Sequence, residues 1–551
     1  MFSMKTIIFL VLFACTLWAR YEVLVDKSIN VAPGIVYKHL RVFEKFWNIN
    51  FLEIDLKNPY VKIETVKAEN SLTGTETVSS MARKRSFAGH QVVAAINADF
   101  FDIDGVPNNV QVVQGQILQN PTNVSTLGFD AENHPWLGMV SFNGEIITKN
   151  GNHSIQGINK IREPDEIVLY NSYYGSSTKT DRWGSEAAIH PITPWIVNDT
   201  VWAVVTAKQS FKGDMAIPEN GAVLSAQGEA MIFLDNNAVI GDTIALVLNL
   251  TPALPKLVEM VGGFPKIVYQ GKNWAAKGYQ EEGGPVHAFQ VHPRTAIGFN
   301  ADSSKFYFFT VDGRKPGVFR GMTLPELADV MIDFGVAYGV NLDGGGSTTF
   351  VLSTEVKNFP TEGEERPVAA ALLAVSTAPN YSLETIQLIP DSLELYFTQK
   401  VKLNFHGWDQ NFNPLQFKEN DFYFETSEGL GEINESGWFK ANTNGAQGYV
   451  YLHYKNIVDS TFIRVIGLKK IKLEPEFSVT DTLQPISLSV TGIAENGKEI
   501  FLADSLVRWV VSNPKVGAVV GSEFIGLNEG TIQLVASLNS MRDTITVQVK
   551  A

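Results

Sequence analysis

The apolar residues of this chain are grouped in short runs that are rich in β-branched and aromatic side chains. Clear examples are Val92–Ile96 (VVAAI), Ile244–Leu250 (IALVLNL) and Phe306–Val311 (FYFFTV). Runs of this length and composition are typical of buried strands. After the N-terminal segment, no run approaches the ~20 residues that a membrane-spanning helix needs. The sequence therefore predicts a chain built around β-sheets.

Few amphipathic helices accompany these strands. The clearest is predicted to begin after Thr323, an N-cap, with Pro325 in its first turn and Glu326 completing a capping box. Apolar residues then recur at helical spacing as far as Gly335, which can close the helix in the left-handed conformation. A second helix is predicted over residues 78–85. We therefore predict that the catalytic part of the chain is an α+β domain with a mixed β-sheet core.

The N-terminus has the pattern of an export signal rather than of a buried helix. A short positive region precedes Thr6–Trp18, which is almost wholly apolar but short for a membrane span. We predict a signal peptide over residues 1–19. The alternative is a lipid anchor at Cys15, because Leu12–Cys15 (LFAC) resembles a lipoprotein box. Either processing route predicts a periplasmic, cell-surface or secreted protein with no transmembrane helix in the mature chain.

Composition narrows the class of protein further. Cys15 is the only cysteine among 551 residues, so the mature chain has no disulfide, no cysteine nucleophile and no thiolate metal site. Hydrophobic residues make up 45% of the chain and charged residues 19%, which is ordinary for a globular protein. The formal net charge of −14 repels phosphate backbones, so nucleic acid is not an expected partner, although a basic pocket for one phosphate is compatible with it.

The texture of the sequence changes near residue 380. Beyond it, strand patterns and turn signals alternate at short intervals, which is typical of β-sandwiches. The segments 381–467 and 468–551 share one plan: an opening strand, paired strands, a polar turn, and a Gly-rich hairpin that leads into closing strands. This order resembles bacterial immunoglobulin-like domains. We predict two all-β immunoglobulin-like sandwiches, which serve as spacers or, as the alternative, bind glycan.

Polar residues of the first 380 positions are concentrated after predicted strands, where binding loops usually form. The first cluster follows VVAAI and contains Asn97, Asp99, Asp102 and Asp104. Asp102 and Asp104 belong to an Asp-x-Asp-Gly turn that resembles part of a calcium loop but lacks its later glutamate. They are weak candidates for a divalent cation such as calcium, and no cofactor is required by the sequence.

Two further clusters combine arginine with other polar residues at strand ends. His292 and Arg294 precede one apolar strand, and Asp312 and Arg314 follow another. A buried arginine is rare unless it is paired. Its guanidinium suits bidentate binding of a phosphate or a carboxylate, while a structural ion pair is the alternative. Asp312-Gly313 is also a common hairpin turn.

The fourth cluster places an acid before a glycine-rich loop. Its candidate residues are Asn341, Asp343, Gly344, Gly345, Gly346, Ser347 and Thr348. Three consecutive glycines allow close approach of the backbone to a ligand, and successive N–H groups can form an anion-binding nest. No Gly-Lys-Ser/Thr follows, so this loop is not a nucleotide P-loop. The four clusters together predict a carboxylate-based hydrolase that acts on an anionic substrate.

At these clusters the chain resembles the phosphodiester glycosidase family. The matching stretches are AAINADFF, HPRTAIGF, VDGR, GMTLPELADVM and NLDGGGSTTF, supported by VGGFPKIV and RPVAAALL, and they extend over roughly residues 30–380. Ala98-Asp99 departs from the family pattern, which often has glycine in the first motif. The resemblance implies hydrolysis of a sugar-1-phosphodiester, such as an N-acetylglucosamine-1-phosphodiester, by a domain spanning residues 20–380. The products are free sugar and a phosphomonoester.

Roles follow from this resemblance and from the chemistry of glycosyl transfer, in which carboxylates stabilise positive charge at the anomeric carbon. Asp343 is predicted to be a catalytic carboxylate, either nucleophile or base, with Asp312 or Asp99 as its partner. The remaining candidates are predicted to bind substrate. Arg294 and Arg314 hold the phosphate, Gly344–Ser347 supply backbone donors, Asn97 and Asn341 orient hydroxyls, and His292 and Thr348 complete the set.

Two other functions fit the same residues. A metal-dependent phosphodiesterase would cleave P–O instead of C–O and needs several ligands around an ion. A non-catalytic surface protein would bind phosphoglycans without turning them over. Loss of activity in chelator favours the first, and binding without turnover favours the second.

Overall fold

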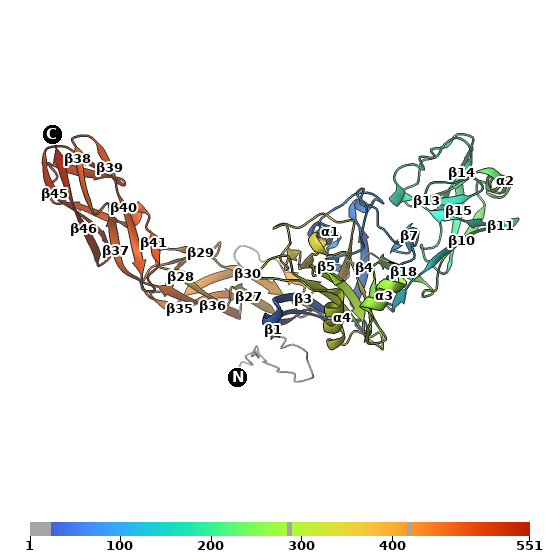
Figure 1. The fold of residues 1–551 in the computed structure, drawn as a ribbon, viewed down its shortest axis with the longest axis horizontal. Coiled ribbons are helices and arrows are strands. Elements are labelled where there is room, and N and C mark those ends of the chain that lie inside the picture. Colours follow the sequence, from blue (N-terminus) through green and yellow to red (C-terminus); the bar gives the residue numbers. More distant parts are fainter. Residues whose placement is uncertain (1–23, 284–288, 416–420, 551) are drawn as a thin grey trace. The chain divides into compact units, whose positions relative to one another are not determined.

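The structure is a computed structural model that describes residues 24–283, 289–415 and 421–550. The predicted signal peptide and Cys15 lie outside these residues. The chain divides into two compact units, residues 1–380 and 381–551 (Figure 1). In the part of the chain that is described, no helix is both long and apolar enough to cross a membrane.

Unit 1 is built around an eight-stranded sheet, whose strands pair in an antiparallel manner. In order across the sheet its strands are β1 (Leu24–Ala32), β2 (Ile35–Val42), β3 (Trp47–Asp55), β22 (Lys305–Val311), β21 (Arg294–Phe299), β23 (Tyr338–Asn341), β19 (Lys266–Tyr269) and β20 (Lys272–Asn273). β22 contains the apolar run FYFFTV, so that strand prediction is confirmed.

A five-stranded sheet covers one face of the first. Its strands are β25 (Glu355–Val356), β24 (Phe350–Leu352), β5 (Gln91–Asn97), β26 (Ala370–Ser376) and β4 (Val61–Lys67). Ile96, Phe350 and Leu372 share one buried cluster with Ile297 and Phe308 of the eight-stranded sheet. The two sheets therefore form a sandwich, and β5 confirms the strand predicted at VVAAI.

Helices cover the outer faces of this sandwich. Leu327 and Met331 of α4 (Leu324–Asp333) pack against Phe51 and Phe309 of the larger sheet, with α3 (Ala275–Glu281) beside α4. Met81 of α1 (Val78–Arg85) packs on the smaller sheet. Both predicted helices are confirmed, and α4 begins with the predicted capping box of Thr323 and Glu326.

The rest of unit 1 is an insertion of two more sheets. One has the order β7 (Gln116–Gln119), β6 (Gln111–Val113), β18 (Leu257–Gly262), β8 (Thr126–Asp130) and β9 (Pro135–Gly138). The other has the order β11 (Gly151–Ile155), β10 (Ser141–Thr148), β17 (Thr243–Thr251), β15 (Thr200–Ser210), β14 (Ser185–Pro191), β16 (Ala222–Ala226), β13 (Ile167–Asn171) and β12 (Gly157–Ile158), with α2 (Gly228–Asn237) alongside. β17 contains IALVLNL, as predicted.

The prediction of a mixed-sheet core needs correction. Among the strand pairs that the structure describes in unit 1, parallel pairing occurs only between β12 and β13, over two residue pairs. The two sheets that form the sandwich pair their strands antiparallel throughout the described registers. Strand direction depends on which strands become neighbours, and short apolar runs do not encode that.

Unit 2 contains two modules with the same strand order. The first module has the sheets β27-β30-β31, β28-β36-β35-β32 and β29-β34-β33. Its strands are β27 (Thr385–Ile389), β28 (Ser392–Tyr396), β29 (Lys400–Lys402), β30 (Asn404–Trp408), β31 (Pro414–Leu415), β32 (Phe422–Thr426), β33 (Gly431–Ile433), β34 (Trp438–Ala441), β35 (Gln447–Tyr454) and β36 (Ile457–Ile466).

The second module repeats this plan with the sheets β37-β40-β41, β38-β46-β45-β42 and β39-β44-β43. Its strands are β37 (Leu468–Glu474), β38 (Phe477–Asp481), β39 (Pro485–Ser487), β40 (Ser489–Ala494), β41 (Glu499–Phe501), β42 (Arg508–Val511), β43 (Gly517–Val520), β44 (Glu523–Gly526), β45 (Gly530–Leu538) and β46 (Met541–Lys550). The all-β nature of this region is confirmed, while its assignment to the immunoglobulin-like class stays a prediction.

Candidate functional site

A cavity of about 490 Å³ opens in unit 1 where strands of the two central sheets end. Arg294 begins β21, Asn341 ends β23, and Asp343 follows β23 by two residues. Asp99 lies two residues beyond the end of β5 in the other sheet. The cavity is lined by Asp99, Phe100, Asn108, Asn109, Thr122, Val124, Phe264, Pro265, Tyr279, His292, Arg294, Arg314, Leu324, Asn341, Asp343, Gly344 and Gly345.

Asn97 links the two central sheets by hydrogen bonds close to the cavity. Its side chain is fully buried and donates from Nδ2 to the carbonyl oxygen of Asp343 (2.7 Å). Its Oδ1 accepts from the Thr295 hydroxyl (2.8 Å) and from the backbone N–H of Thr349 (3.1 Å). The Asp343 N–H donates to the carbonyl of Ala98 (3.1 Å). Asn97 therefore positions Asp343, and it is not among the residues that line the cavity.

Two carboxylates, those of Asp99 and Asp343, face the cavity. Burial raises the pKa of Asp99 to about 7, and the nearby charge of Asp343 contributes to this rise. Burial also raises the pKa of Asp343 to about 6, against hydrogen bonds from the Ser347 side chain and the Gly344 backbone. Asp99 Oδ2 accepts from the backbone N–H of Asn109 (3.1 Å). Near neutral pH the pair can therefore hold one proton, which is suitable for acid–base or nucleophilic chemistry.

Gly262 is required by the close approach of Asp99. A Cβ at this position would lie 2.3 Å from Asp99 Oδ2. Any side chain there would displace the carboxylate or the strand β18 that carries the glycine. The carboxylate is thus held between β18 and the loop of Asn109.

Three basic side chains lie on the same cavity. Arg294 is 8% exposed and donates from Nε to the Met322 carbonyl (2.9 Å) and from an Nη to the Gln290 carbonyl (2.6 Å). Burial and the like charge of Arg314 lower its pKa to about 10, so it remains charged at neutral pH. An Nη of Arg314 donates to Nδ1 of His292 (3.3 Å). The like charges of Arg294 and Arg314 favour an anion in the cavity.

The glycine-rich loop is shaped by these arginines. Gly345 has φ 64°, and a Cβ there would lie 3.0 Å from an Nη of Arg314. A Cβ on Gly346 would lie 2.2 Å from Arg366. The N–H groups of Gly345, Ser347 and Thr348 donate to carbonyls of Pro293, Gly344 and Gly345. The amides of Gly345 and Ser347, which the sequence predicted to be backbone donors to the substrate, are therefore already bonded within the chain.

Asp312 is placed apart from the cavity lining. It is 1% exposed, its Oδ2 accepts from Asn48 Nδ2 (2.6 Å), and its Oδ1 accepts from the Phe359 N–H (2.9 Å). Burial raises its pKa to about 6 although these donors lower it. Of the two predicted partners of Asp343, the structure thus brings Asp99, and not Asp312, to the cavity.

The predicted metal candidates Asp102 and Asp104 form an exposed turn. Asp102 Oδ1 accepts from the N–H groups of Asp104 (3.0 Å) and Val106 (2.9 Å). Gly105 completes the turn with φ 80°. The hydrogen bonds of Asp102 within the turn therefore explain the Asp-x-Asp-Gly motif without a bound metal ion.

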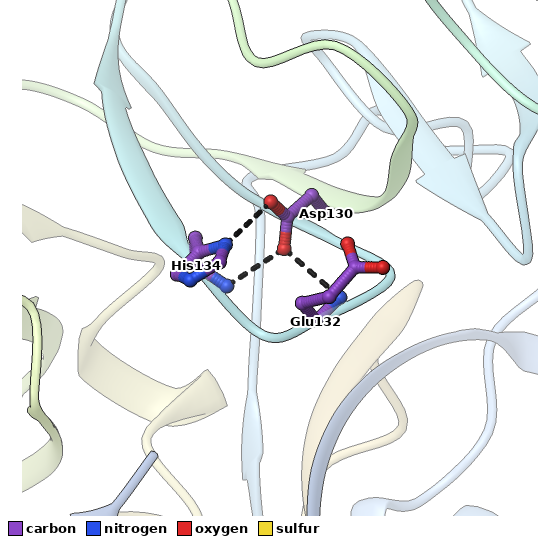
Figure 2. A group of neighbouring side chains, drawn as sticks. All are labelled: Asp130, Glu132 and His134. Atoms are coloured by element: carbon purple, nitrogen blue, oxygen red, sulfur yellow. Dashed lines mark hydrogen bonds and ion pairs between the residues drawn. The ribbon is translucent and has the colours of Figure 1, made fainter. Parts of the chain in front are cut away.

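A second group with ligand-type side chains lies between β8 and β9. The ligand atoms of Asp130, Glu132 and His134 lie within 4.8 Å of one another. Figure 2 shows that Asp130 already accepts from the His134 ring (2.8 Å) and from the backbone N–H groups of Glu132 (3.0 Å) and His134 (2.8 Å). The arrangement is that of a polar hairpin turn.

Several cavity residues were missed by the sequence analysis. Tyr279 on α3 and Val124 and Thr122 on the loop before β8 belong to no recognised motif. Phe264 and Pro265 lie in the stretch VGGFPKIV, which was noted only as supporting the resemblance. The sheet order brings these segments together, and no local pattern encodes that order.

The first module of unit 2 also has a feature that the sequence analysis did not find. Four aromatic rings lie in a row on one sheet face. The ring centroids of Tyr449 and Tyr451 are 5.9 Å apart, and those of Tyr451 and His453 are 6.3 Å apart. The His453 ring stacks on that of Tyr423, with centroids 4.5 Å apart. By strand register, the positions in the second module that correspond to Tyr449, Tyr451 and His453 carry Gln533, Val535 and Ser537. The second module thus adopts the same strand order without aromatic residues at these three positions, so the rings are not needed for the fold.

Comparison with known proteins bears on unit 1. Residues 194–375 match the family described as phosphodiester glycosidase. This match includes Arg294 and Asp343 but not Asp99. The human N-acetylglucosamine-1-phosphodiester alpha-N-acetylglucosaminidase is 36% identical over 72 residues, which are 13% of this chain and 13% of the human protein. The chain therefore aligns with only about an eighth of that relative's length.

Solved structures give more extended alignments. A hypothetical protein from Synechocystis is 20% identical, with 64% of this chain and 63% of that chain covered and a TM-score of 0.48. The catalytic domain of the zebrafish N-acetylglucosamine-1-phosphodiester alpha-N-acetylglucosaminidase is 16% identical, with 64% and 87% covered and a TM-score of 0.33. The resemblance to the phosphodiester glycosidase family, predicted from the sequence, is thus confirmed by the family match of residues 194–375.

Proposed function

We propose that the chain is an exported glycosidase that hydrolyses a sugar-1-phosphodiester. The single observation that carries this proposal is the cavity itself, in which the buried carboxylate of Asp99 and the half-buried carboxylate of Asp343 share the lining with two arginines and a histidine. Carboxylates suit a glycosyl centre that gains positive charge, and guanidinium groups suit a phosphodiester. The family match over residues 194–375 supports the same reaction class.

Asp343 is the catalytic carboxylate of this proposal, and Asp99 is its partner. The negative charge of Asp343 contributes to the raised pKa of Asp99, so we assign the charge of the pair to Asp343 and its proton to Asp99. Ionised Asp343 faces the anomeric carbon, while Asp99 carries the proton that the pair retains. The C–O bond to the phosphodiester breaks and the water oxygen ends on the anomeric carbon. One water proton stays on the new sugar hydroxyl, the other passes to the carboxylate of Asp343 and then to solvent, and the phosphomonoester leaves with the electron pair of the broken bond.

Arg294, Arg314 and His292 bind the phosphodiester. The leaving phosphate group is a weak base, so its negative charge needs stabilisation more than protonation. Arg294 suits this role because its guanidinium is fixed by two carbonyl groups and stays charged. The export of the protein rests on the N-terminal pattern of residues 1–19, which remains a proposal.

The experiment uses the protein without its predicted leader, residues 20–551. It is incubated with UDP-N-acetylglucosamine and with a methyl phosphodiester of N-acetylglucosamine 1-phosphate, with and without chelator. Free sugar together with the intact phosphomonoester is the expected result. Release of sugar 1-phosphate would establish P–O cleavage, and its loss in chelator would establish a metal-dependent phosphodiesterase. Saturable binding without either product would establish a binding protein.

A further inference from the structure

Two buried polar atoms on the cavity have no hydrogen-bond partner among the residues that the structure describes. They are Oδ1 of Asn341, which is 3% exposed, and the hydroxyl of Tyr279, which is 9% exposed. Both residues line the cavity. An unsatisfied buried polar group destabilises a folded protein, so each such group calls for an explanation. A ligand in the cavity can supply the missing partner.

The orientation of Asn341 defines what that partner must be. Its Nδ2 donates to the Phe264 carbonyl (2.7 Å), which fixes the amide and leaves Oδ1 as an acceptor. An acceptor binds a hydroxyl or an amide N–H, and it repels the oxygens of an ionised phosphodiester. The phosphate therefore cannot bind against Asn341.

Tyr279 borders an apolar wall. Its ring centroid lies 5.7 Å from that of Phe264, and Pro265 and Val124 line the same cavity. The tyrosine ring provides an apolar surface and its hydroxyl provides one polar contact. A sugar ring has the matching groups, because it has an apolar C–H face and hydroxyl groups at its edge.

Besides its two carboxylates, the cavity is thus lined by basic residues and by neutral ones. We propose that Asn341 and Tyr279 are specificity-determining residues that bind the neutral glycosyl group of the substrate, while His292, Arg294 and Arg314 bind its phosphodiester. The proposal rests on the proposed function and adds the direction in which the substrate lies. It also requires that the sugar present a hydroxyl or amide N–H donor to Oδ1 of Asn341.

The test is the substitution Tyr279→Phe, which removes only the hydroxyl. Binding of two probes is measured by calorimetry without turnover: inorganic phosphate, and a panel of N-acetylglucosamine, N-acetylgalactosamine, glucose and galactose. We expect a loss of about tenfold in affinity for the bound sugar and unchanged affinity for phosphate. We also expect no loss of thermal stability, because among the described residues the hydroxyl has no hydrogen-bond partner to lose.

Tyr170→Phe is the matched control. Tyr170 is 1% exposed, it lies on β13, and its hydroxyl donates to the Lys160 carbonyl (2.6 Å). This variant is expected to lose stability and keep both affinities, which is the opposite pattern.

Two results overturn the proposal. One is equal binding of sugar by Tyr279→Phe and the unaltered protein, and the other is the absence of saturable binding for every sugar of the panel. Neither binding measurement depends on hydrolysis. If the protein binds sugar as expected but does not hydrolyse the phosphodiester, the proposed reaction is wrong while the sugar-binding roles of Asn341 and Tyr279 still hold.

Discussion

Asp343 and Asp312 follow strands of the same sheet, and both have a pKa raised by burial to about 6, yet their surroundings differ. Asp312 is enclosed, and its two oxygens accept from Asn48 and Phe359 of its own chain. Asp343 opens onto a cavity that also contains arginine side chains. A raised pKa therefore does not by itself separate a catalytic carboxylate from a structural one. What separates them is whether a face remains open to a ligand.

The largest effect expected from this comparison is that of Asp343→Asn on turnover. Removing the charge at the reacting centre is expected to lower kcat by about 10³–10⁴-fold. The measurement is release of free sugar under saturating substrate. Near-normal turnover by this variant would falsify the catalytic assignment.

Asp312→Asn is expected to show the reverse pattern. All the groups facing this carboxylate are donors, so one half of the new amide must point its N–H₂ at another donor. We expect the free energy of unfolding to fall by about 2–3 kcal/mol, with kcat within about threefold of the unaltered protein at low temperature. Denaturant unfolding measures the first and sugar release the second. A stable variant without activity would place Asp312 in the reaction and remove the contrast.

A second pair of variants compares an arginine of the cavity with an arginine outside it. Arg294→Lys keeps the charge but cannot bond the Met322 and Gln290 carbonyls while holding a phosphate. We expect KM to rise by about 10–100-fold, because charge-assisted hydrogen bonds contribute about 1.5–3 kcal/mol. Arg320→Lys is the control, since Arg320 pairs with Glu326 away from the cavity lining. An equal KM in both variants would exclude Arg294 from phosphate binding.

The pH profile reports on the carboxylate pair. Turnover requires ionised Asp343, with a pKa of about 6, and protonated Asp99, with a pKa of about 7. We expect a bell-shaped dependence of kcat/KM with limbs near these values, each falling about tenfold per pH unit. The limbs belong to the coupled pair rather than to either residue alone. Asp99→Asn is expected to remove the alkaline limb, and a limb that persists there would have another source.

How far the sequence predicts this site depends on what is local. The runs around β5, β17 and β22 and the capping box of α4 depend on nearby residues, and they were predicted correctly. Asp343 and Arg294 were found for the same reason, because each adjoins a recognisable strand. Antiparallel pairing and the choice between Asp99 and Asp312 depend on which strands become neighbours. Tyr279 reaches the cavity through sheet order, which a single sequence does not reveal.

The smallest expected effect is on stability, and it again contrasts the two kinds of carboxylate. The folded pKa of Asp343 is raised from 3.8 to about 6, so the native state holds its proton more tightly than the unfolded state does. Its contribution to stability is full below pH ~4 and is lost as pH rises through about 6. Asp343→Asn removes this loss. We therefore expect its Tm to exceed that of the unaltered protein by a few degrees at pH 7 and to match it more closely at pH 4. Asp312 has a similarly raised pKa, but its two oxygens accept from Asn48 and Phe359, and the amide of Asp312→Asn replaces one of these acceptors with a donor. We therefore expect this variant to have a lower Tm at pH 7. Scanning calorimetry of both variants at the two pH values tests this, and parallel behaviour of the two would mean that Asp343 is as enclosed as Asp312.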